Sequence, residues 1–271
     1  MEQDVLRKVQ LTQLEIAREI RRVCEENDIP YFLCDGTLLG AVRHGGFIPW
    51  DDDMDLGMLR KDYERFCRIA PEKLGKDYVL QTWYTDPNFA LPFAKVRKRG
   101  TLYLEAKSSR LKENGFFVDI FPFDYVPEDT GSQAALSGKL LGIYRVKLMK
   151  SRYTPWMEND KIIWKKRIGY LYYQMKALFT NQEKLAKDFD TLAVAAPKSS
   201  VLCEQSALPR PDYYEAGWCE ETTELMFEGE RFLAPAKYTE YLTALYGDYM
   251  QLPPEDQREN RHQIVELNFG E

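Results

Sequence analysis

The sequence predicts an α+β fold in which helices flank a mixed β-sheet, with a helical insertion and a C-terminal extension. Three observations predict it: an amphipathic helical pattern over roughly the first 25 residues, short apolar runs of strand character up to about residue 125, and a long helical pattern from Ser132 to about Ala195. The 271 residues are enough for one large domain, or for one domain with a helical appendage. We therefore expect a core unit over residues 1–130 and a helical and mixed region over 131–271, without a sharp linker between them.

Local patterns place the elements along the chain. Apolar residues recur at helical spacing between Leu6 and Cys24, and the segment Asn27–Pro30 ends that helix. The following YFLC predicts a short buried strand, and residues 36–43 predict a turn that runs into a short helix. The later elements are expected in this order: a strand at the aspartates after Trp50, a helix over Arg60–Ala70, strands in YVLQTWY, FAKVRKRGTLYLE and GFFVDIFPFDYV, short strands between Leu202 and Met250, and a helix near Tyr238–Tyr246.

Composition excludes several classes of protein. The net charge of −6 argues against general nucleic-acid binding, which normally needs a basic surface. The charged start MEQDVLRKVQ does not resemble a signal peptide, and we expect no transmembrane segment because no apolar run reaches the roughly 18 residues that span a bilayer. Five scattered cysteines without a CxxC pair, together with two histidines, make a structural zinc site improbable. Reduced thiols in a cytoplasmic protein are the simplest interpretation.

Four carboxylates stand within five positions: Asp51, Asp52, Asp53 and Asp55. Asp53 and Asp55 alternate with apolar residues, and a period of two predicts that both project from one face of a strand. Two carboxylates on one strand face repel each other unless a cation lies between them, because burying them alone is costly. Oxygen ligands alone point to Mg²⁺, with Mn²⁺ as the alternative. The segment therefore predicts a divalent-metal site and phosphoryl or nucleotidyl chemistry.

A Gly-Thr pair precedes these acids. Gly36 and Thr37 stand between a predicted strand and a predicted helix, where backbone amides at a helix N-terminus can bind an anion. A Gly-Thr turn followed by two carboxylates on a strand is the arrangement of the nucleotidyltransferase fold, which adds a third carboxylate on a neighbouring strand. Asp119 in FFVDIF fits that position, because no basic residue within four positions on either side offsets its charge. Asp124 is the alternative third acid.

Three cations are candidates for binding phosphate. Lys95 and Arg97 alternate with apolar neighbours, so both are expected on one strand face, as a pyrophosphate clamp or on a solvated edge strand. Arg43 lies between the turn and the acids and is a candidate for a phosphate contact or a structural role, with a surface salt bridge as the alternative.

At these residues the sequence resembles the LicD family of phosphocholine transferases, which is related to the fukutin-related ribitol-phosphate transferases. The resemblance rests first on DGTLLGAVRHGGFIPWDDDMDLGM, a long and specific motif, and continues through KVRKRGT and FVDIFPFD. It ends in FEGERFLAPAKYTEYLTALYGDYMQLPP and is weakest over residues 132–195. It therefore covers most of the chain.

The resemblance implies transfer of a phospho-alcohol, typically phosphocholine, from a CDP-linked donor to a hydroxyl of a cell-surface glycan or its precursor. It implies that Asp53 and Asp55 bind the metal and that Asp119 is the third acid. From these parts we expect Asp53, Asp55 and Asp119 to hold one or two Mg²⁺ ions at the donor pyrophosphate, and Asp119 to act as general base. Two alternatives stay open: a nucleotidyltransferase that moves NMP from an NTP onto a small hydroxylated acceptor, and a non-catalytic nucleotide-binding pseudoenzyme.

Overall fold

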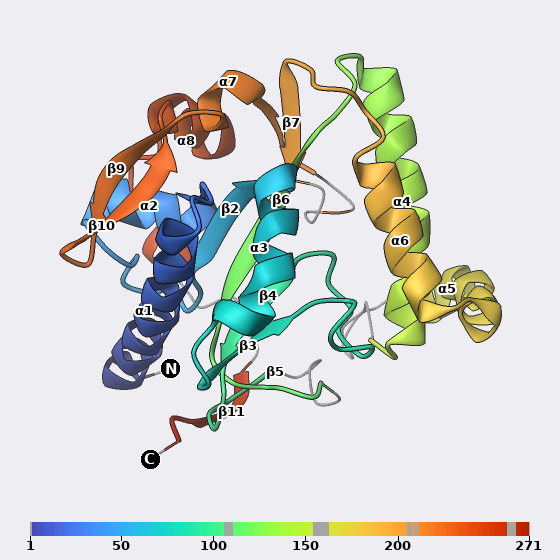
Figure 1. The fold of residues 1–271 in the computed structure, drawn as a ribbon, viewed down its shortest axis with the longest axis horizontal. Coiled ribbons are helices and arrows are strands. Elements are labelled where there is room, and N and C mark those ends of the chain that lie inside the picture. Colours follow the sequence, from blue (N-terminus) through green and yellow to red (C-terminus); the bar gives the residue numbers. More distant parts are fainter. Residues whose placement is uncertain are drawn as a thin grey trace.

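The computed structural model describes residues 2–105, 111–153, 163–204, 208, 211–258 and 264–270. Within these ranges helices and strands alternate up to residue 73, and four strands in succession and then three helices follow. Short strands and helices complete the chain (Figure 1). The predicted α+β class is confirmed.

The helices follow the predicted order. They are α1 (Gln3–Glu26), α2 (Asp35–His44), α3 (Arg60–Lys73), α4 (Thr130–Lys150), α5 (Ile163–Phe179), α6 (Gln182–Ala193), α7 (Ala216–Cys219) and α8 (Tyr238–Tyr246), with a 3₁₀ turn over Glu255–Gln257. The strands are β1 (Phe32–Leu33), β2 (Asp55–Leu59), β3 (Tyr78–Gln81), β4 (Ala94–Lys98), β5 (Leu102–Glu105), β6 (Phe117–Tyr125), β7 (Val201–Glu204), β8 (Tyr213–Glu215), β9 (Thr222–Phe227), β10 (Glu230–Pro235) and β11 (Ile264–Asn268).

One mixed sheet organises the fold. Its strands follow the order β1-β2-β6-β4-β3, and β7 extends it by pairing with the far end of β6 and with β8. The pair β2–β6 is parallel and the other pairs are antiparallel. The separation into residues 1–130 and 131–271 stays a prediction, although β7 and β8, from the second half of the chain, join this sheet.

Helices α1 and α3 lie side by side against one face of the sheet (Figure 1). Tyr63, Phe66 and Ala70 form the buried side of α3, and the apolar side of α1 enters the same core. Arg60 of α3 pairs with Asp124 on β6, so the covered face is the one that holds Asp124. Because side chains alternate along a strand, Asp119 projects from the opposite face.

The helical segment predicted from Ser132 to Ala195 forms α4, α5 and α6, which stand together beside the sheet (Figure 1). Two smaller apolar clusters hold these helices, one with Leu140 and Phe189 and the other with Val146, Ala177 and Leu185. No helix in the described ranges is both long and apolar enough to cross a membrane.

The C-terminal segment returns to the start of the chain. Strands β9 and β10 form a hairpin beside β1, and α8, at the bounds predicted for it, packs against α2. Strand β11 pairs with β5. The extension thus encloses α2, which positions the Gly-Thr pair.

Candidate active site

Helix α1 anchors the loop that carries the acids. Gln10 Nε2 donates to the Asp51 carbonyl (2.9 Å), and Gln13 Nε2 donates to the Asp52 carbonyl (2.8 Å). The Asp52 side chain is fully buried and its Oδ2 accepts from Tyr103 Oη at 3.2 Å. Asp52 therefore holds the loop in place, whereas Asp51 and Asp53 are half-buried.

Asp55 begins β2, and Asp53 lies just before the strand rather than within it. The backbone N–H of Asp55 donates to Thr37 Oγ1 at 2.8 Å, so the hydroxyl of the predicted phosphate-binding Thr37 ties α2 to the acids. Asp55 is the register partner of Asp119 on the parallel strand β6. The predicted third acid is thus on the neighbouring strand, beside Asp55.

Several carboxylates surround Asp55. Burial raises its pKa well above the ordinary range, and repulsion from Asp53, Asp119, Asp35 and Asp51 raises it further. A cation among these oxygens would offset the repulsion, because an opposite charge favours the ionised form of a carboxyl.

The donor set fits a divalent metal. Among the residues that the structure describes, the acids whose oxygens all lie within 4.8 Å of one another are Asp51, Asp52 and Asp53. This triplet differs from the predicted Asp53, Asp55 and Asp119 and adds Asp51 to the candidate ligands. A set of carboxylate oxygens without sulfur or imidazole is what Mg²⁺ and Mn²⁺ prefer.

No residue close to Asp119 in sequence offsets its charge, but a lysine on a neighbouring strand does. Lys95 is its register partner on β4, and Lys95 Nζ lies 2.7 Å from Oδ1 and 2.9 Å from Oδ2 of Asp119. Both side chains are more than nine-tenths buried, and Lys95 Nζ also lies 3.3 Å from the centre of the Phe117 ring. The counter-charge comes from a neighbouring strand, which local sequence around Asp119 does not reveal.

Arg97 shares the strand face of Lys95 but has different partners. Its Nε donates to Gln81 Oε1 (2.6 Å) and its Nη1 donates to the Gly115 carbonyl (2.7 Å). It is 1% exposed, and burial lowers its pKa to about 10. The alternative of a solvated edge strand was wrong, because β4 lies between β6 and β3. These contacts favour a structural role for Arg97.

Asp124, the alternative third acid, points the other way. Arg60 holds it through two hydrogen bonds, from Nε to Oδ1 (2.6 Å) and from Nη2 to Oδ2 (2.8 Å). It is 1% exposed and lies on the sheet face that α3 covers. This geometry assigns Asp124 to a structural ion pair.

The Gly-Thr pair occupies the first turn of α2. A Cβ added to Gly36 would come within 2.9 Å of Asp51 Oδ2, so the absent side chain lets this carboxylate approach the helix N-terminus. A carboxylate there is stabilised by the exposed N–H groups and the helix dipole. The same N-terminus is the predicted anion site.

Asp35 is a further acid beside this site and was not among the predicted residues. Its backbone is left-handed (φ 47°), and its Oδ1 accepts from Tyr241 Oη at 3.1 Å. Burial raises its pKa to about 6, and Glu204 on β7 is hydrogen-bonded to it. Asp35 could have been identified from its position directly before Gly36. No local pattern pointed to Glu204, which lies far away in the sequence.

Arg43 connects α2 to the C-terminal segment. Its Nη1 donates to the carbonyls of Tyr249 (2.9 Å) and Gln251 (3.3 Å), and its Nε donates to His44 Nε2 (3.0 Å). These contacts favour the structural alternative over a phosphate contact.

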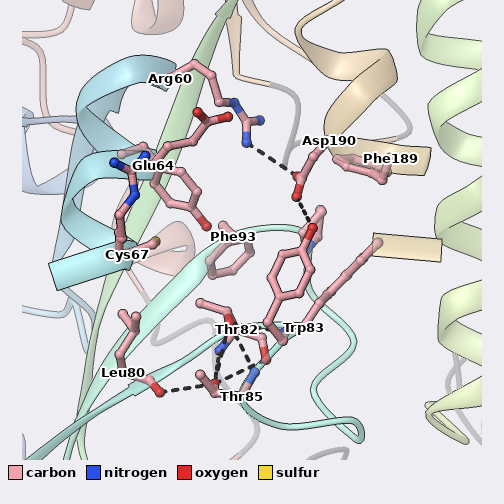
Figure 2. A pocket seen from close by; sticks show the side chains of 14 residues that line it. Arg60, Glu64, Cys67, Leu80, Thr82, Trp83, Thr85, Phe93, Phe189 and Asp190 are labelled. Carbon is pink, nitrogen blue, oxygen red and sulfur yellow. Dashed lines mark hydrogen bonds and ion pairs between the residues drawn. The ribbon is translucent and has the colours of Figure 1, made fainter. Parts of the chain in front are cut away.

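A pocket of about 310 Å³ lies beyond the acid site, between α3, the segment 82–93 and α6 (Figure 2). Aromatic side chains form much of its wall: Tyr63, Trp83, Tyr84, Phe93 and Phe189. Asp190 stands at one side, where it accepts from Tyr84 Oη (2.6 Å) and pairs with Arg60.

Phe93 separates this pocket from the acid site. Its ring contacts Phe121 (4.6 Å between centroids) and lies 5.5 Å from Lys95 Nζ. None of the predicted site residues lines the pocket, which is therefore a neighbour of the acid site and not part of it.

Comparison with known proteins gives two kinds of match. The model of the LicD/FKTN/FKRP nucleotidyltransferase domain matches residues 28–140, the segment that holds the acids, Lys95 and Arg97. The lipopolysaccharide cholinephosphotransferase LicD of Haemophilus influenzae is 31% identical over an alignment of 275 residues, gaps included, which covers 97% of each chain. The ribitol 5-phosphate transferase FKRP of Homo sapiens is 50% identical over 48 residues, 18% of this chain and 10% of its own length.

Proposed function

This chain belongs to the LicD family, and we propose that it transfers a phospho-alcohol from a CDP-linked donor to a hydroxyl of a cell-surface glycan or its precursor. Phosphocholine is the first candidate for the transferred group, and CMP is the product that leaves. The observation that carries the proposal is that Asp55 and Asp119 are register partners on adjacent strands. The loop with Asp51, Asp52 and Asp53, here named the aspartate loop, lies directly before Asp55, and Gly36 and Thr37 begin the helix beside it. The Haemophilus relative is named for cholinephosphate transfer to lipopolysaccharide, and FKRP for transfer of ribitol 5-phosphate. Both names support a phospho-alcohol as the transferred group.

Asp53, Asp55 and Asp119 would hold Mg²⁺ or Mn²⁺, with Asp51 near enough to the acids to contribute. The repulsion around Asp55 and the oxygen-only donors support this assignment. When bound, the ion would offset the negative charge of the pyrophosphate and of the departing CMP.

Lys95 and Asp119 act as a pair in this proposal. Lys95 holds the Asp119 carboxylate in place, and an oxygen of that carboxylate would accept the proton of the acceptor hydroxyl. The hydroxyl oxygen then forms a bond to the phosphorus of the phospho-alcohol while the bond from phosphorus to the CMP oxygen breaks, and CMP leaves with the bonding electrons. The Lys95 ammonium has three N–H donors, so it could bind a pyrophosphate oxygen as well as Asp119.

The start of α2 would bind the donor. The backbone amides at Gly36 and Thr37 belong to the first turn of this helix, where N–H groups without a partner inside the helix attract an anion such as phosphate. Thr37 contributes through its position and not through its hydroxyl, which Asp55 uses. Arg97 and Arg43 hold β4 and the C-terminal segment in place.

The test is a donor panel with full-length protein, Mg²⁺ and a glycan acceptor: CDP-choline, CDP-ribitol, CDP-glycerol, CTP and ATP. The proposal predicts CMP release from one of the CDP-alcohols and no pyrophosphate release from CTP or ATP. Pyrophosphate release from a nucleoside triphosphate would instead support transfer of NMP. Binding of a CDP-alcohol without turnover would support the pseudoenzyme.

A further inference from the structure

Helix α5 exposes an unusual number of large apolar side chains. Seven of them are between 55% and 88% exposed: Trp164, Ile168, Leu171, Tyr172, Met175, Leu178 and Phe179. They recur at spacings of three and four residues, so they form one continuous side of the helix, here named the α5 stripe. An exposed apolar surface of this extent marks an interaction site.

The opposite side of α5 is already used. Ala177 is buried against Val146 of α4, and Tyr173 packs on the same cluster. Arg145 of α4 donates to Tyr173 Oη at 3.2 Å. The helix is therefore held in place by α4, and this packing turns the α5 stripe outward.

Cations border the α5 stripe. Lys165 Nζ lies 5.4 Å from the Trp164 ring centre, and Lys176 Nζ lies 5.0 Å from that of Tyr172. Helix α5 has four basic residues and no Asp or Glu, and α4 likewise has four basic residues and no acid. Lys147 of α4 is buried, but Lys165 and Lys176 stand beside the α5 stripe without an acidic residue on either helix, in a chain with a net charge of −6.

From this combination we propose that α5 binds in the plane of a membrane whose surface carries anionic, phosphate-bearing lipids, with the α5 stripe at the boundary of the acyl chains. A helix with Trp, Leu and Phe on one side and basic residues along its edges has the composition of interfacial helices. Its 17 residues extend about 26 Å and include four cations, so it lies on a bilayer and does not cross it.

The charge distribution favours a lipid surface over a second copy of the chain. A symmetric dimer through the α5 stripe would bring the lysines that border the stripe, Lys165 and Lys176, close to the same lysines of its partner. An anionic membrane supplies the complementary charge. The proposal is independent of the chemistry at the acids, although it would hold the protein at the surface where lipid-linked acceptors are found.

The first test is co-sedimentation of the full-length protein with two kinds of vesicles: phosphatidylcholine alone, and phosphatidylcholine with about one third phosphatidylglycerol. We expect sedimentation with the anionic vesicles only. It should weaken between about 0.1 M and about 1 M salt, as the Debye length falls from ~10 Å to ~3 Å. Absence of binding to the anionic vesicles would overturn the proposal.

Two pairs of matched variants locate the binding surface. Leu171→Glu with Met175→Glu should abolish sedimentation, whereas Leu11→Glu with Met226→Glu, at residues of similar exposure on α1 and β9, should not. Lys165→Glu with Lys176→Glu should weaken binding by at least about 25-fold, since each Lys near an anionic surface contributes about fivefold. Lys61→Glu with Lys76→Glu, both exposed and outside α4 and α5, is the charge control.

Circular dichroism checks folding, and Leu178→Ser with Phe179→Ser replaces the glutamate variant if that variant unfolds. Unchanged sedimentation of the folded stripe variant would overturn the proposal. So would a wild-type dimer in analytical ultracentrifugation that the stripe variant dissociates, because the α5 stripe would then be a self-association surface.

Discussion

Asp55 and Asp119 are register partners on the parallel strands β2 and β6, at the point where the aspartate loop enters the sheet. Burial and the carboxylates around it raise the pKa of Asp55, while Lys95 offsets the charge of Asp119 from the other side. Two acids side by side in one sheet therefore have opposite surroundings. Asp55 lies among negative charges and Asp119 is paired with a positive one.

The Lys95–Asp119 pair should be important for stability. Lys95→Met leaves Asp119 buried without its partner, and breaking a buried ion pair costs about 3–5 kcal/mol. Lys98→Met, on the opposite face of β4, removes a partly exposed pair with Glu15 and should cost at most about 1 kcal/mol. Urea unfolding without metal measures both. Equal losses in the two variants would contradict the structural importance of the Lys95–Asp119 pair.

Lys95 and Arg97 should differ in donor binding. Lys95→Ala is expected to weaken binding of CDP-choline by about 1.5 kcal/mol or more, the value of a charge-assisted contact, and to leave cytidine binding unchanged. Arg97→Lys, which disturbs internal contacts to Gln81 and Gly115, should lower the melting temperature without this selectivity. Calorimetry with both ligands separates the roles. A selective loss for CDP-choline in the Arg97 variant would restore Arg97 to the phosphate clamp.

The third acid can be identified by comparing two asparagine variants. Asp119→Asn should reduce turnover at least about 100-fold, the usual contribution of a general base, and reduce the rise in melting temperature that Mg²⁺ produces. Asp124→Asn weakens the buried pair with Arg60 and should lower stability while turnover per folded molecule is retained. If Mg²⁺ still raises the melting temperature of Asp119→Asn fully, Asp119 acts as base without binding metal. Normal turnover of Asp119→Asn would reject both roles.

Lys147 should make stability depend on pH. Burial lowers its pKa from 10.5 to about 7, and its Nζ donates to the Pro87 carbonyl at 3.1 Å. Between these two pKa values the unfolded chain holds a proton that the folded chain does not, so this residue makes the free energy of unfolding rise with pH. The expected rise from about pH 7 to about pH 9 is on the order of 1–2 kcal/mol.

Lys147→Met should remove that rise, and Lys139→Met, an exposed lysine of the same helix, should retain it. Urea unfolding of the three proteins at both pH values gives the comparison. A wild type and a Lys147→Met variant with the same pH dependence would show that the Lys147 amine is charged in the folded protein at both values.

Much of the fold could be predicted because its signals are local. The periodicity in α1 and α8 and the apolar run of β6 lie within single segments, and the structure has all three. The pairing of Lys95 with Asp119 could not be predicted, because it depends on the register between strands 24 positions apart. The same limitation hid the pairing of β7 with β6, which brings Glu204 from a distant segment to Asp35.

Asp53 and Asp55 were predicted to share a strand face, yet β2 begins only at Asp55. The alternation of polar and apolar residues begins in the loop before β2. There the backbone is held by hydrogen bonds from Gln10 and Gln13 instead of by pairing with another strand. Local pattern identified the acids but not the boundary between loop and strand.

CMP release from CDP-choline by Asp55→Asn shows whether these acids hold a divalent cation for transfer from a CDP-alcohol. We expect EDTA to stop release by the wild type and Asp55→Asn to lower it at least about 100-fold, close to 3 kcal/mol of transition-state stabilisation. The exposed Asp77→Asn should match the wild type. Release that persists in EDTA, or an Asp55→Asn rate within about tenfold of wild type, would contradict the metal assignment.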